Sequence, residues 1–286
     1  MISDITLGQF FPGVSYLHRL DPRTKIIISL IFIIAVFLAN TPVAFLTLAL
    51  STLLFIRISR IALSTVLKGI KPLIFILIFT ALLNVFLTKG EGEPLVDFWV
   101  ITVYSDGIIK AVFMALRVIV LIMGTSVLLT YTTSPIALTD GLESLLSPLK
   151  LLHVPVHVFA MMMSIALRFI PTLVEETEKI MNAQKSRGAD FESGNLIRRA
   201  KALIPILIPL FVCSFNRAEE LATAMECRCY RGDKNRTKLV KLSYGARDFA
   251  FMLLFAALLA VIISLRIIPN NIELNGKIFE VLFYRI

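Results

Sequence analysis

Long uncharged apolar runs separated by short charged connectors dominate the first half of the chain. No charged residue interrupts the thirty-one positions from Ile26 to Ile56, and Asn40-Thr41-Pro42 breaks this run in its middle. Two short helices in a hairpin fit this pattern best, with one long tilted helix as the alternative. Because crossing about 30 Å of hydrocarbon takes roughly 20 apolar residues, each half is slightly short. The flanking Lys25 and Arg57 then have to extend toward the headgroups, unless the bilayer is thinned locally.

Three further apolar runs predict additional membrane spans, from Pro72 to about Thr88, from Ile108 to Thr130 and from Phe249 to Leu265. Lys110 and Arg117 interrupt the second of these runs, so they must face the protein interior, a water-filled cavity or the interface. The acidic segment from Lys89 to Asp106 contains glycines and a proline, and it is predicted to be an outside loop. The pattern predicts an all-α integral membrane protein with about five transmembrane helices.

The distribution of basic residues predicts the topology, because Lys and Arg accumulate in the cytoplasmic loops of membrane proteins. This rule places on the inside the N-terminal segment with Arg19, Arg23 and Lys25, the connector from Arg57 to Lys71, and the segment from Tyr131 to Arg247. The connector before the fourth span and the C-terminal tail fall outside. We therefore expect a multi-pass protein of the plasma membrane with a cytoplasmic N-terminus. A rival topology with seven spans adds Leu151 to Leu167 and Ala202 to Asn216, and the same rule disfavours it.

Composition agrees with membrane insertion and argues against a soluble protein, a nucleic-acid-binding protein and a disulfide-rich protein. Of the 286 residues, 57% are hydrophobic and 17% are charged, and the mean hydropathy is +0.83, which is more apolar surface than a soluble core of this size would bury. The net charge of +9 comes from basic blocks between apolar runs, so topology and anionic membrane lipid explain it better than nucleic acid. Three cysteines, an odd number in a basic segment, predict reduced cytoplasmic thiols and no disulfide framework.

The segment after the fourth span predicts a separate coupling module. Ser134-Pro135 is a good helix start, and the leucines that follow recur at helical spacing, which indicates a short amphipathic helix at the membrane surface. Two long helices are then expected, from about Val156 to Ser186 and from about Leu196 to Cys229, each with an apolar first half and a charged second half. Three prolines are expected to kink them, at Pro171, Pro205 and Pro209. The predicted division is 1–133 (membrane domain with four spans), 134–245 (cytoplasmic or interfacial coupling module) and 246–286 (last span and tail).

The two long helices end in similar sequences. Ala183-Gln184-Lys185-Ser186-Arg187-Gly188 and Ala224-Met225-Glu226-Cys227-Arg228-Cys229 share an Ala-x-x-x-Arg pattern, forty-one residues apart, and each follows a Glu-Glu pair. Each helix therefore carries at its end one arginine between small residues. A planar guanidinium there can pair with carboxylates or carbonyls of a partner in forked geometry, and small neighbours let the partner's backbone come close. The alternative is that Arg187 and Arg228 only favour the negative end of a helix dipole.

These two motifs resemble the signature motifs of the transmembrane coupling subunit, or T component, of energy-coupling factor (ECF) transporters for vitamins and metals. The resemblance extends from about Leu17 to Asp248. It also rests on His18-Arg19-Leu20-Asp21-Pro22-Arg23-Thr24-Lys25, Thr139-Asp140-Gly141-Leu142-Glu143, Leu146-Ser147-Pro148-Leu149-Lys150, Leu167-Arg168-Phe169-Ile170-Pro171 and Arg217-Ala218-Glu219-Glu220-Leu221. The second motif departs from the family, because cysteines stand where alanine before the arginine and glycine after it are expected.

The resemblance implies a coupling subunit that links ATP hydrolysis by two partner ATPases to uptake through a separate substrate-binding membrane subunit. The implied ATPase contacts are Ala183, Ser186, Arg187, Gly188, Ala224, Cys227, Arg228 and Cys229, and the expected substrate-subunit contacts are Met161, Met162, Ile165, Leu207, Leu210 and Phe211. The chain lacks the G-x-x-x-x-G-K-[ST] loop that cradles nucleotide phosphates. ATP and Mg are therefore expected on the partners, with no cofactor bound by this chain and no catalysis by it.

An intramembrane metal-dependent protease is the alternative from another class. His153 and His157 are four residues apart and Glu175-Glu176 lies downstream, which are residue types that a metal peptidase uses. Pro155 separates the two histidines, however, no H-E-x-x-H motif occurs, and His18 is the one further histidine. Cys227-x-Cys229 lacks a second cysteine pair to complete a tetrahedral metal site, and Met161-Met162-Met163 is interpreted as packing.

Overall fold

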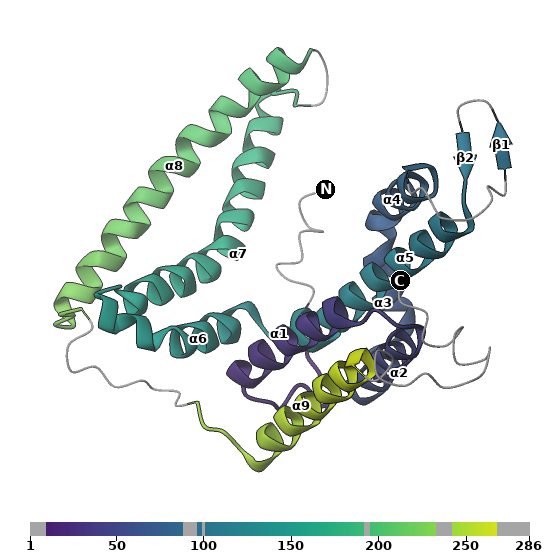
Figure 1. Cartoon of the computed structure of the whole chain (residues 1–286). Coiled ribbons are helices and arrows are strands. Elements are labelled where there is room, and N and C mark those ends of the chain that lie inside the picture. The colour runs from purple at the N-terminus through teal and green to yellow at the C-terminus, as the bar shows by residue number, and fades with distance from the viewer. Residues whose placement is uncertain (1–9, 88–95, 99–100, 192–194, 233–241, 268–286) are drawn as a thin grey trace, which may run out of the picture. The chain divides into compact units, whose positions relative to one another are not determined.

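The computed structural model describes residues 10–87, 96–98, 101–191, 195–232 and 242–267. Its elements are α1 (Pro22–Leu38), α2 (Pro42–Ser59), α3 (Leu63–Ile70), η1 (Lys71–Leu73), α4 (Ile74–Leu87), β1 (Val96–Phe98), β2 (Ile101–Val103), α5 (Ser105–Thr125), η2 (Ser126–Thr130), α6 (Pro135–Leu145), η3 (Ser147–Leu152), α7 (Val156–Ser186), α8 (Leu196–Cys227) and α9 (Ala246–Ile267). Figure 1 shows a chain made almost entirely of helices. The all-α fold class is confirmed.

The chain forms two compact units. Of the described residues, the membrane unit comprises those from 10 to 141 with 242–267, and the coupling unit comprises those from 142 to 232. The boundary falls inside α6, between Gly141 and Leu142. The domain limits inferred from the sequence, at 133/134 and 245/246, stay predictions.

The first apolar run folds as the two expected short helices, and the single long helix was wrong. The two helices pack on α5 and α9 rather than closely on each other, so the expected hairpin packing differs. Asp21 caps α1, since its Oδ1 accepts a hydrogen bond from the Arg23 N–H at 2.9 Å. Thr41 caps α2 in the same way, with its Oγ1 3.3 Å from the Ala44 nitrogen. A proline follows each cap, which suits the first helical turn because proline has no N–H to satisfy there. The 17 residues of α1 span about 26 Å at 1.5 Å per residue, so α1 is short for the bilayer.

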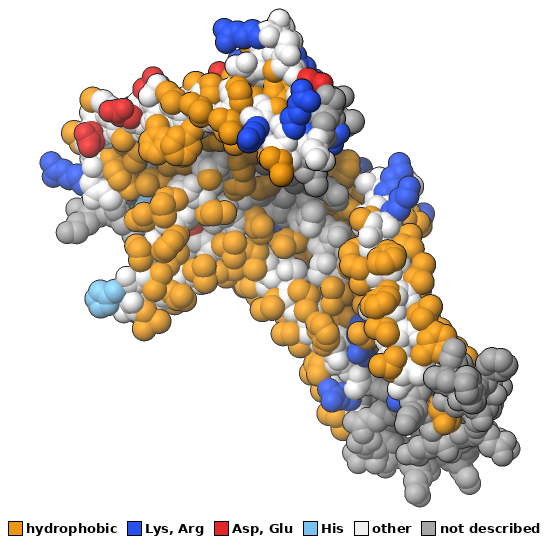
Figure 2. Space-filling model, turned by 90° about the horizontal axis from the view of Figure 1, so that it is seen from above, with side chains coloured by type: hydrophobic (Ala, Val, Ile, Leu, Met, Phe, Trp, Pro, Cys, Tyr) orange, Lys and Arg blue, Asp and Glu red, His pale blue; other side chains and the backbone are white. Residues whose placement is uncertain are grey.

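Aromatic rings join the helices of the membrane unit. Phe255 of α9 is fully buried, stacks on Phe55 of α2 with ring centroids 4.8 Å apart, and meets Phe32 of α1 edge-on at 6.5 Å. Phe32 also lies against Gly124 of α5, where an added Cβ would be 2.1 Å from the ring. Only a glycine lets α5 approach α1 this closely. Much of the outward surface is apolar (Figure 2), with Phe75 78% and Leu253 74% exposed, which suits contact with lipid tails.

Arg117 fulfils the expectation that a charge inside a span faces the protein. Its Nη2 donates to the Ala39 carbonyl at 2.8 Å and to the Asn40 side-chain oxygen at 3.3 Å, and its guanidinium lies 5.3 Å from the centre of the Phe45 ring. It therefore closes the turn between α1 and α2. Lys110, the other charge in this span, is exposed.

Five helical segments are long and apolar enough to cross a membrane: Pro42–Ser59, Leu63–Leu87, Gly107–Thr130, Val156–Ser186 and Ala246–Ile267. The number agrees with the prediction, but the membership differs. By length and composition α7, which was assigned to the coupling module, qualifies, whereas α1 is too short. In the described part of the predicted outside loop, β1 and β2 pair antiparallel, with Val96 opposite Val103. The C-terminal tail lies outside the described residues.

The coupling unit contains the two long helices at nearly the predicted bounds. The start of α7 and its end at Ser186 are as predicted, and α8 ends at Cys227, two residues earlier than expected. Figure 1 shows α7 bent, and Pro171 lies near the middle of that helix. The short helix expected after Ser134-Pro135 is α6, which crosses the boundary between the two units, and the Ser134 hydroxyl accepts a hydrogen bond from the Ala137 N–H at 3.3 Å. Its position at the membrane surface stays a prediction.

Candidate functional site

The carboxyl end of α7 closes in a Schellman turn. The Gly188 N–H donates to the Lys185 carbonyl at 2.9 Å, and the Ala189 N–H donates to the Gln184 carbonyl at 3.0 Å. These two bonds define the motif. Gly188 has the left-handed conformation that the motif requires, with φ of +86°, and open space surrounds the position where a Cβ would stand. Arg187 is the residue at which the helix ends.

The carboxyl end of α8 repeats this backbone. The Cys229 N–H donates to the Glu226 carbonyl at 2.8 Å, and the Tyr230 N–H donates to the Met225 carbonyl at 3.0 Å. Cys229 is left-handed, with φ of +57°, although it carries a side chain. In both helices the arginine N–H lies 3.3 Å from the carbonyl of the alanine four residues earlier. The Ala-x-x-x-Arg repeat in the sequence is therefore a repeat of one turn geometry.

All eight residues predicted to contact the ATPases are exposed. We call Ala183, Ser186, Arg187 and Gly188 the α7 tip, and Ala224, Cys227, Arg228 and Cys229 the α8 tip. Within the described part of the chain, neither the Arg187 nor the Arg228 guanidinium has a hydrogen bond or an ion pair. Both side chains are therefore available to a partner.

The two tips lie at opposite ends of α8. Residues 187–195 connect α7 to α8, so the α7 tip is near the start of α8, whereas the α8 tip lies at its far end (Figure 1). The 32 residues of α8 span about 48 Å at 1.5 Å per residue. The tips are thus two separate points at the ends of a long helix.

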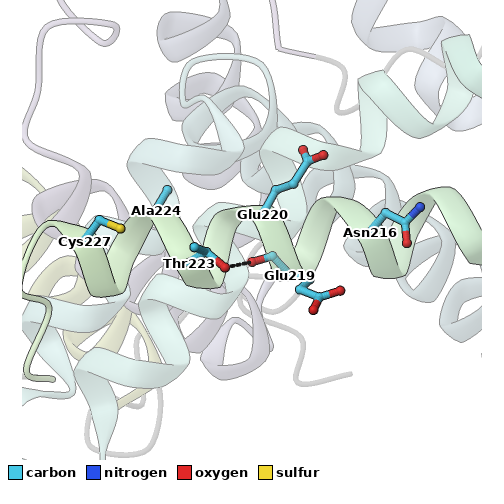
Figure 3. Close-up of a pocket in the computed structure, with 6 residues that line it drawn as sticks. All are labelled: Asn216, Glu219, Glu220, Thr223, Ala224 and Cys227. Atoms are coloured by element: carbon cyan, nitrogen blue, oxygen red, sulfur yellow. Dashed lines mark hydrogen bonds between the residues drawn. The ribbon is translucent and has the colours of Figure 1, made fainter.

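One face of α8 leads to the α8 tip along a shallow depression of about 590 Å³ (Figure 3). Six residues at helical spacing line it: Asn216, Glu219, Glu220, Thr223, Ala224 and Cys227. The Thr223 hydroxyl donates to the Glu219 carbonyl at 2.9 Å. The sequence analysis assigned Ala224 and Cys227 to partner contact. The structure adds an acidic and polar surface next to them. In the sequence, the Glu219-Glu220 pair was the feature that could have predicted this surface.

The residues predicted to contact a substrate subunit lie on the apolar halves of α7 and α8. Met162, Leu207 and Phe211 are exposed, whereas Met161, Ile165 and Leu210 are half-buried. The rings of Phe211 and Phe215 lie 4.7 Å apart along α8. The arrangement gives each long helix an outward apolar surface, as the pattern of the sequence indicated.

The residues behind the alternative enzymatic hypothesis are not gathered together. His157 Nδ1 lies 2.9 Å from Glu143 Oε1, a pairing that the sequence did not suggest, whereas His153 is exposed in a left-handed turn after η3. No group of three His, Cys, Asp or Glu side chains arranged to hold a metal ion occurs among the described residues. Cys213, Cys227 and Cys229 are all free thiols.

Comparison with known proteins matches this chain to one family model and to individual relatives, all of which are named as transport proteins. The family model CbiQ, described as a cobalt transport protein, matches residues 13–239, which include both tips. The energy-coupling factor transporter transmembrane protein EcfT of Clostridium kluyveri is 52% identical over 267 residues, covering 93% of this chain and 98% of that protein. The EcfT proteins of Ruminiclostridium cellulolyticum and Bacillus subtilis are 54% and 47% identical, over 87% and 93% of this chain and 92% and 100% of those proteins.

The chain belongs to the family of ECF transporter T components. The resemblance inferred from the sequence is therefore confirmed, and the chain is a membrane-embedded transport protein. The relatives are named as transmembrane components of a transporter, and their names describe no catalysis. Within this T-component family, the roles of individual tip residues remain predictions for this chain.

Proposed function

We propose that this T component is the coupling subunit of an ECF transporter. It links ATP hydrolysis by two partner ATPases to the uptake of a vitamin or a metal ion through a separate substrate-binding membrane subunit. The single observation that carries the proposal is the repeated turn that ends α7 and α8, each with one exposed arginine that has no partner within the described chain.

Each tip suits insertion into a cleft. The left-handed residue reverses the chain directly after the arginine, and the small residues on either side leave room for a partner's backbone. The guanidinium then pairs with a carboxylate or with carbonyl oxygens through two parallel hydrogen bonds. One tip contacts one ATPase and the other tip contacts the second, because the tips lie at opposite ends of α8.

The orientation of α8 follows from the need for both tips to reach the same side of the membrane. A helix of about 48 Å that crossed the bilayer would carry its two ends into different compartments. We infer that α8 lies along the cytoplasmic surface, with the N-terminus of the chain on the same side. Its apolar half and that of α7 then face lipid and the substrate subunit through Met161, Met162, Ile165, Leu207, Leu210 and Phe211.

Energy enters through the partners. ATP and Mg bind to the ATPases, and this chain supplies neither a phosphate-binding loop nor a catalytic group to the reaction. Closure of the ATPase pair on ATP displaces the two tips, and the long helices transmit that movement to their apolar halves. The substrate subunit resting there tilts and releases its substrate.

The test is the double charge reversal Arg187→Glu with Arg228→Glu, in tagged chain purified from its own host membranes in mild detergent. We expect the variant to reach the membrane at the wild-type level and to lose the ATPase subunits and the ATP hydrolysis that elute with the wild type. Lys68→Glu with Lys71→Glu is the matched control, since it makes the same change of charge at exposed positions of α3 and η1, in the unit that contains neither tip. Normal ATPase recovery with the tip variant contradicts the docking proposal.

The orientation has a test of its own. A cysteine introduced at Ala189, beside the α7 tip, should resist a membrane-impermeant thiol reagent in intact cells and react after the cells are opened. The chain's own cysteines are replaced by alanine first, so that the label reports this position alone. Labelling in intact cells contradicts the cytoplasmic placement.

A further inference from the structure

A buried polar cluster lies in the membrane unit, outside the tips. Lys25, in the first turn of α1, is 2% exposed, and its Nζ donates to the carbonyls of Thr132 at 2.7 Å and His18 at 3.3 Å. The carboxylates of Asp248 and Asp21 attract its positive charge and favour the charged form of the lysine. A buried ammonium is costly unless such partners compensate for its lost hydration. We call Asp21, Lys25 and Asp248 the Lys25 cluster.

Asp248 ties α9 to the start of α1. It is 4% exposed; its Oδ1 accepts a hydrogen bond from the Asp21 N–H at 2.9 Å, and its Oδ2 accepts one from the Gly245 N–H at 2.8 Å. The Asp21 side chain in turn caps α1 through the Arg23 N–H. The cluster therefore holds the beginnings of two helices that are more than two hundred residues apart in sequence.

The carbonyl that Lys25 holds belongs to the connection between the fourth span and the coupling module. The π-helical turn η2 ends at Thr130, and α6 begins at Pro135. Thr132, which is 2% exposed, lies between them. Its carbonyl is bonded by the Lys25 ammonium rather than by a helical N–H. The segment from which α6 starts is thus fixed to α1 by a charged hydrogen bond.

A second contact holds α6 to the same helix. A Cβ added at Gly141 would lie 3.0 Å from the Pro22 Cβ and 3.2 Å from the Ile26 Cδ1. These distances are tight for carbon atoms, so a Cβ at position 141 would fit only if its neighbours on α1 shifted by a few tenths of an ångström. Lys25 and Gly141 together fix the first half of α6 at both of its ends. The coupling unit begins at the next residue, Leu142.

We propose that Asp21, Lys25 and Asp248 are positioning residues for transport. They fix the segment from Thr132 to Gly141, which we call the root of α6, to α1 and α9, so that movement of the coupling helices reaches the substrate subunit. This inference rests on the proposed coupling function. The coupling helices can pass on a movement only if the segment that joins them to the membrane unit stays in place. The Lys25 cluster and Gly141 hold that segment. Without them, ATP-driven movement of the tips displaces the root of α6, and hydrolysis continues with little transport.

Two variants release the root of α6 by different routes. Lys25→Met with Asp248→Asn removes the bond to Thr132 while it removes one charge of each sign, so that no unpaired buried charge is created. Gly141→Leu leaves every charge in place and forces α6 away from Pro22 and Ile26. Lys110→Met is the control, since it makes the same side-chain change at an exposed lysine of α5.

The measurement uses the whole complex, purified from host membranes with its own ATPases and substrate subunit and reconstituted in vesicles. The probe is whichever radiolabelled vitamin or cobalt ion wild-type vesicles accumulate when ATP is supplied. For both variants we expect normal ATPase recovery, ATP hydrolysis within about twofold of wild type, and about tenfold less uptake per ATP hydrolysed. The Lys110→Met control should match wild type in all three.

The opposing results are distinct. If uptake per ATP is unchanged in either variant, or if subunit recovery, hydrolysis and uptake fall together, the cluster only stabilises the fold and the inference is overturned. If wild-type complex retains no ATPase or shows no ATP-dependent uptake, the proposed function fails, and the inference fails with it. That failure is recognised because it occurs without any substitution.

Discussion

The α7 tip and the α8 tip share one backbone and differ in the residue at its most demanding position. Both end in the same pair of Schellman hydrogen bonds, with lengths that agree within 0.1 Å. Gly188 adopts the left-handed conformation without penalty, whereas Cys229 adopts it at a cost of roughly 1 kcal/mol for a residue with a Cβ. The α8 tip therefore keeps the turn in spite of its sequence. Under the proposed docking, the placement of the arginine would matter more than the identity of its neighbours.

The likeness of the two helices is confined to their last turn. At the same forty-one-residue offset, Glu178 and not Glu175 or Glu176 corresponds to Glu219. The acidic and polar depression that leads to the α8 tip is lined by side chains of α8 alone among the described residues. The tips thus combine a common arginine turn with different surroundings, and each part of that contrast can be changed separately.

The largest expected effect comes from reversing one arginine at a time. Arg187→Glu or Arg228→Glu leaves a single docking point, and the loss of the second point should weaken ATPase binding by about 100-fold, because linked sites gain this much from one another. Binding of the ATPases purified from the wild-type complex to each variant in nanodiscs measures it. A variant that binds like wild type shows that its tip takes no part in docking.

Replacing either arginine by lysine sharpens the comparison at constant charge. Arg187→Lys and Arg228→Lys keep the positive charge and lose the planar fork that makes two parallel hydrogen bonds. We expect about tenfold weaker ATPase binding for each, in the same nanodisc assay. Equal affinity of the lysine variants and wild type would mean that only charge is recognised.

Exchanging the left-handed residues should produce small effects of opposite sign. Gly188→Ala introduces a Cβ into open space, so its cost is conformational, about 1 kcal/mol. Cys229→Gly removes the corresponding cost at the α8 tip. Amide hydrogen exchange of the last helical turn should become roughly fivefold faster in the first variant and slower by a similar factor in the second. Changes of the same sign would contradict the assignment of strain to Cys229.

The smallest effect is expected from the thiols themselves. Cys227→Ala with Cys229→Ala keeps small side chains at both positions, and ATPase recovery should remain within about twofold of wild type. A large loss of ATPase would show that the sulfur atoms, rather than the size of the residues, are needed at the α8 tip.

Local patterns in the sequence predicted the elements that depend on neighbouring residues. The break at Asn40-Thr41-Pro42 predicted the boundary between α1 and α2, and the Ser134-Pro135 start predicted α6. The repeated Ala-x-x-x-Arg pattern found both tips. The glycine after Arg187 is a signal for a left-handed turn, although no such turn was predicted there. No such signal exists at Cys229, where the turn was visible only in the structure.

The features that the sequence did not predict depend on contacts between distant residues. Asp248 bonds the backbone of Asp21 across 227 residues, and Lys25 bonds Thr132 across 107. Neither pair leaves a periodic pattern in one sequence. The π-helical turn η2 was read as part of a regular span for a different reason, since one extra residue per turn does not alter an uncharged run such as Val118 to Thr130.

Site-specific photo-crosslinking tests the central claim most directly. A benzoylphenylalanine replaces Ser186 in one variant and Cys227 in another, each beside its arginine, and the intact complex is irradiated in native membranes. We predict that each position crosslinks to an ATPase subunit, and that a chain carrying both groups captures two ATPase subunits. Crosslinks to lipid alone, or from both positions to the same ATPase subunit, would contradict the account of two tips that hold two ATPases.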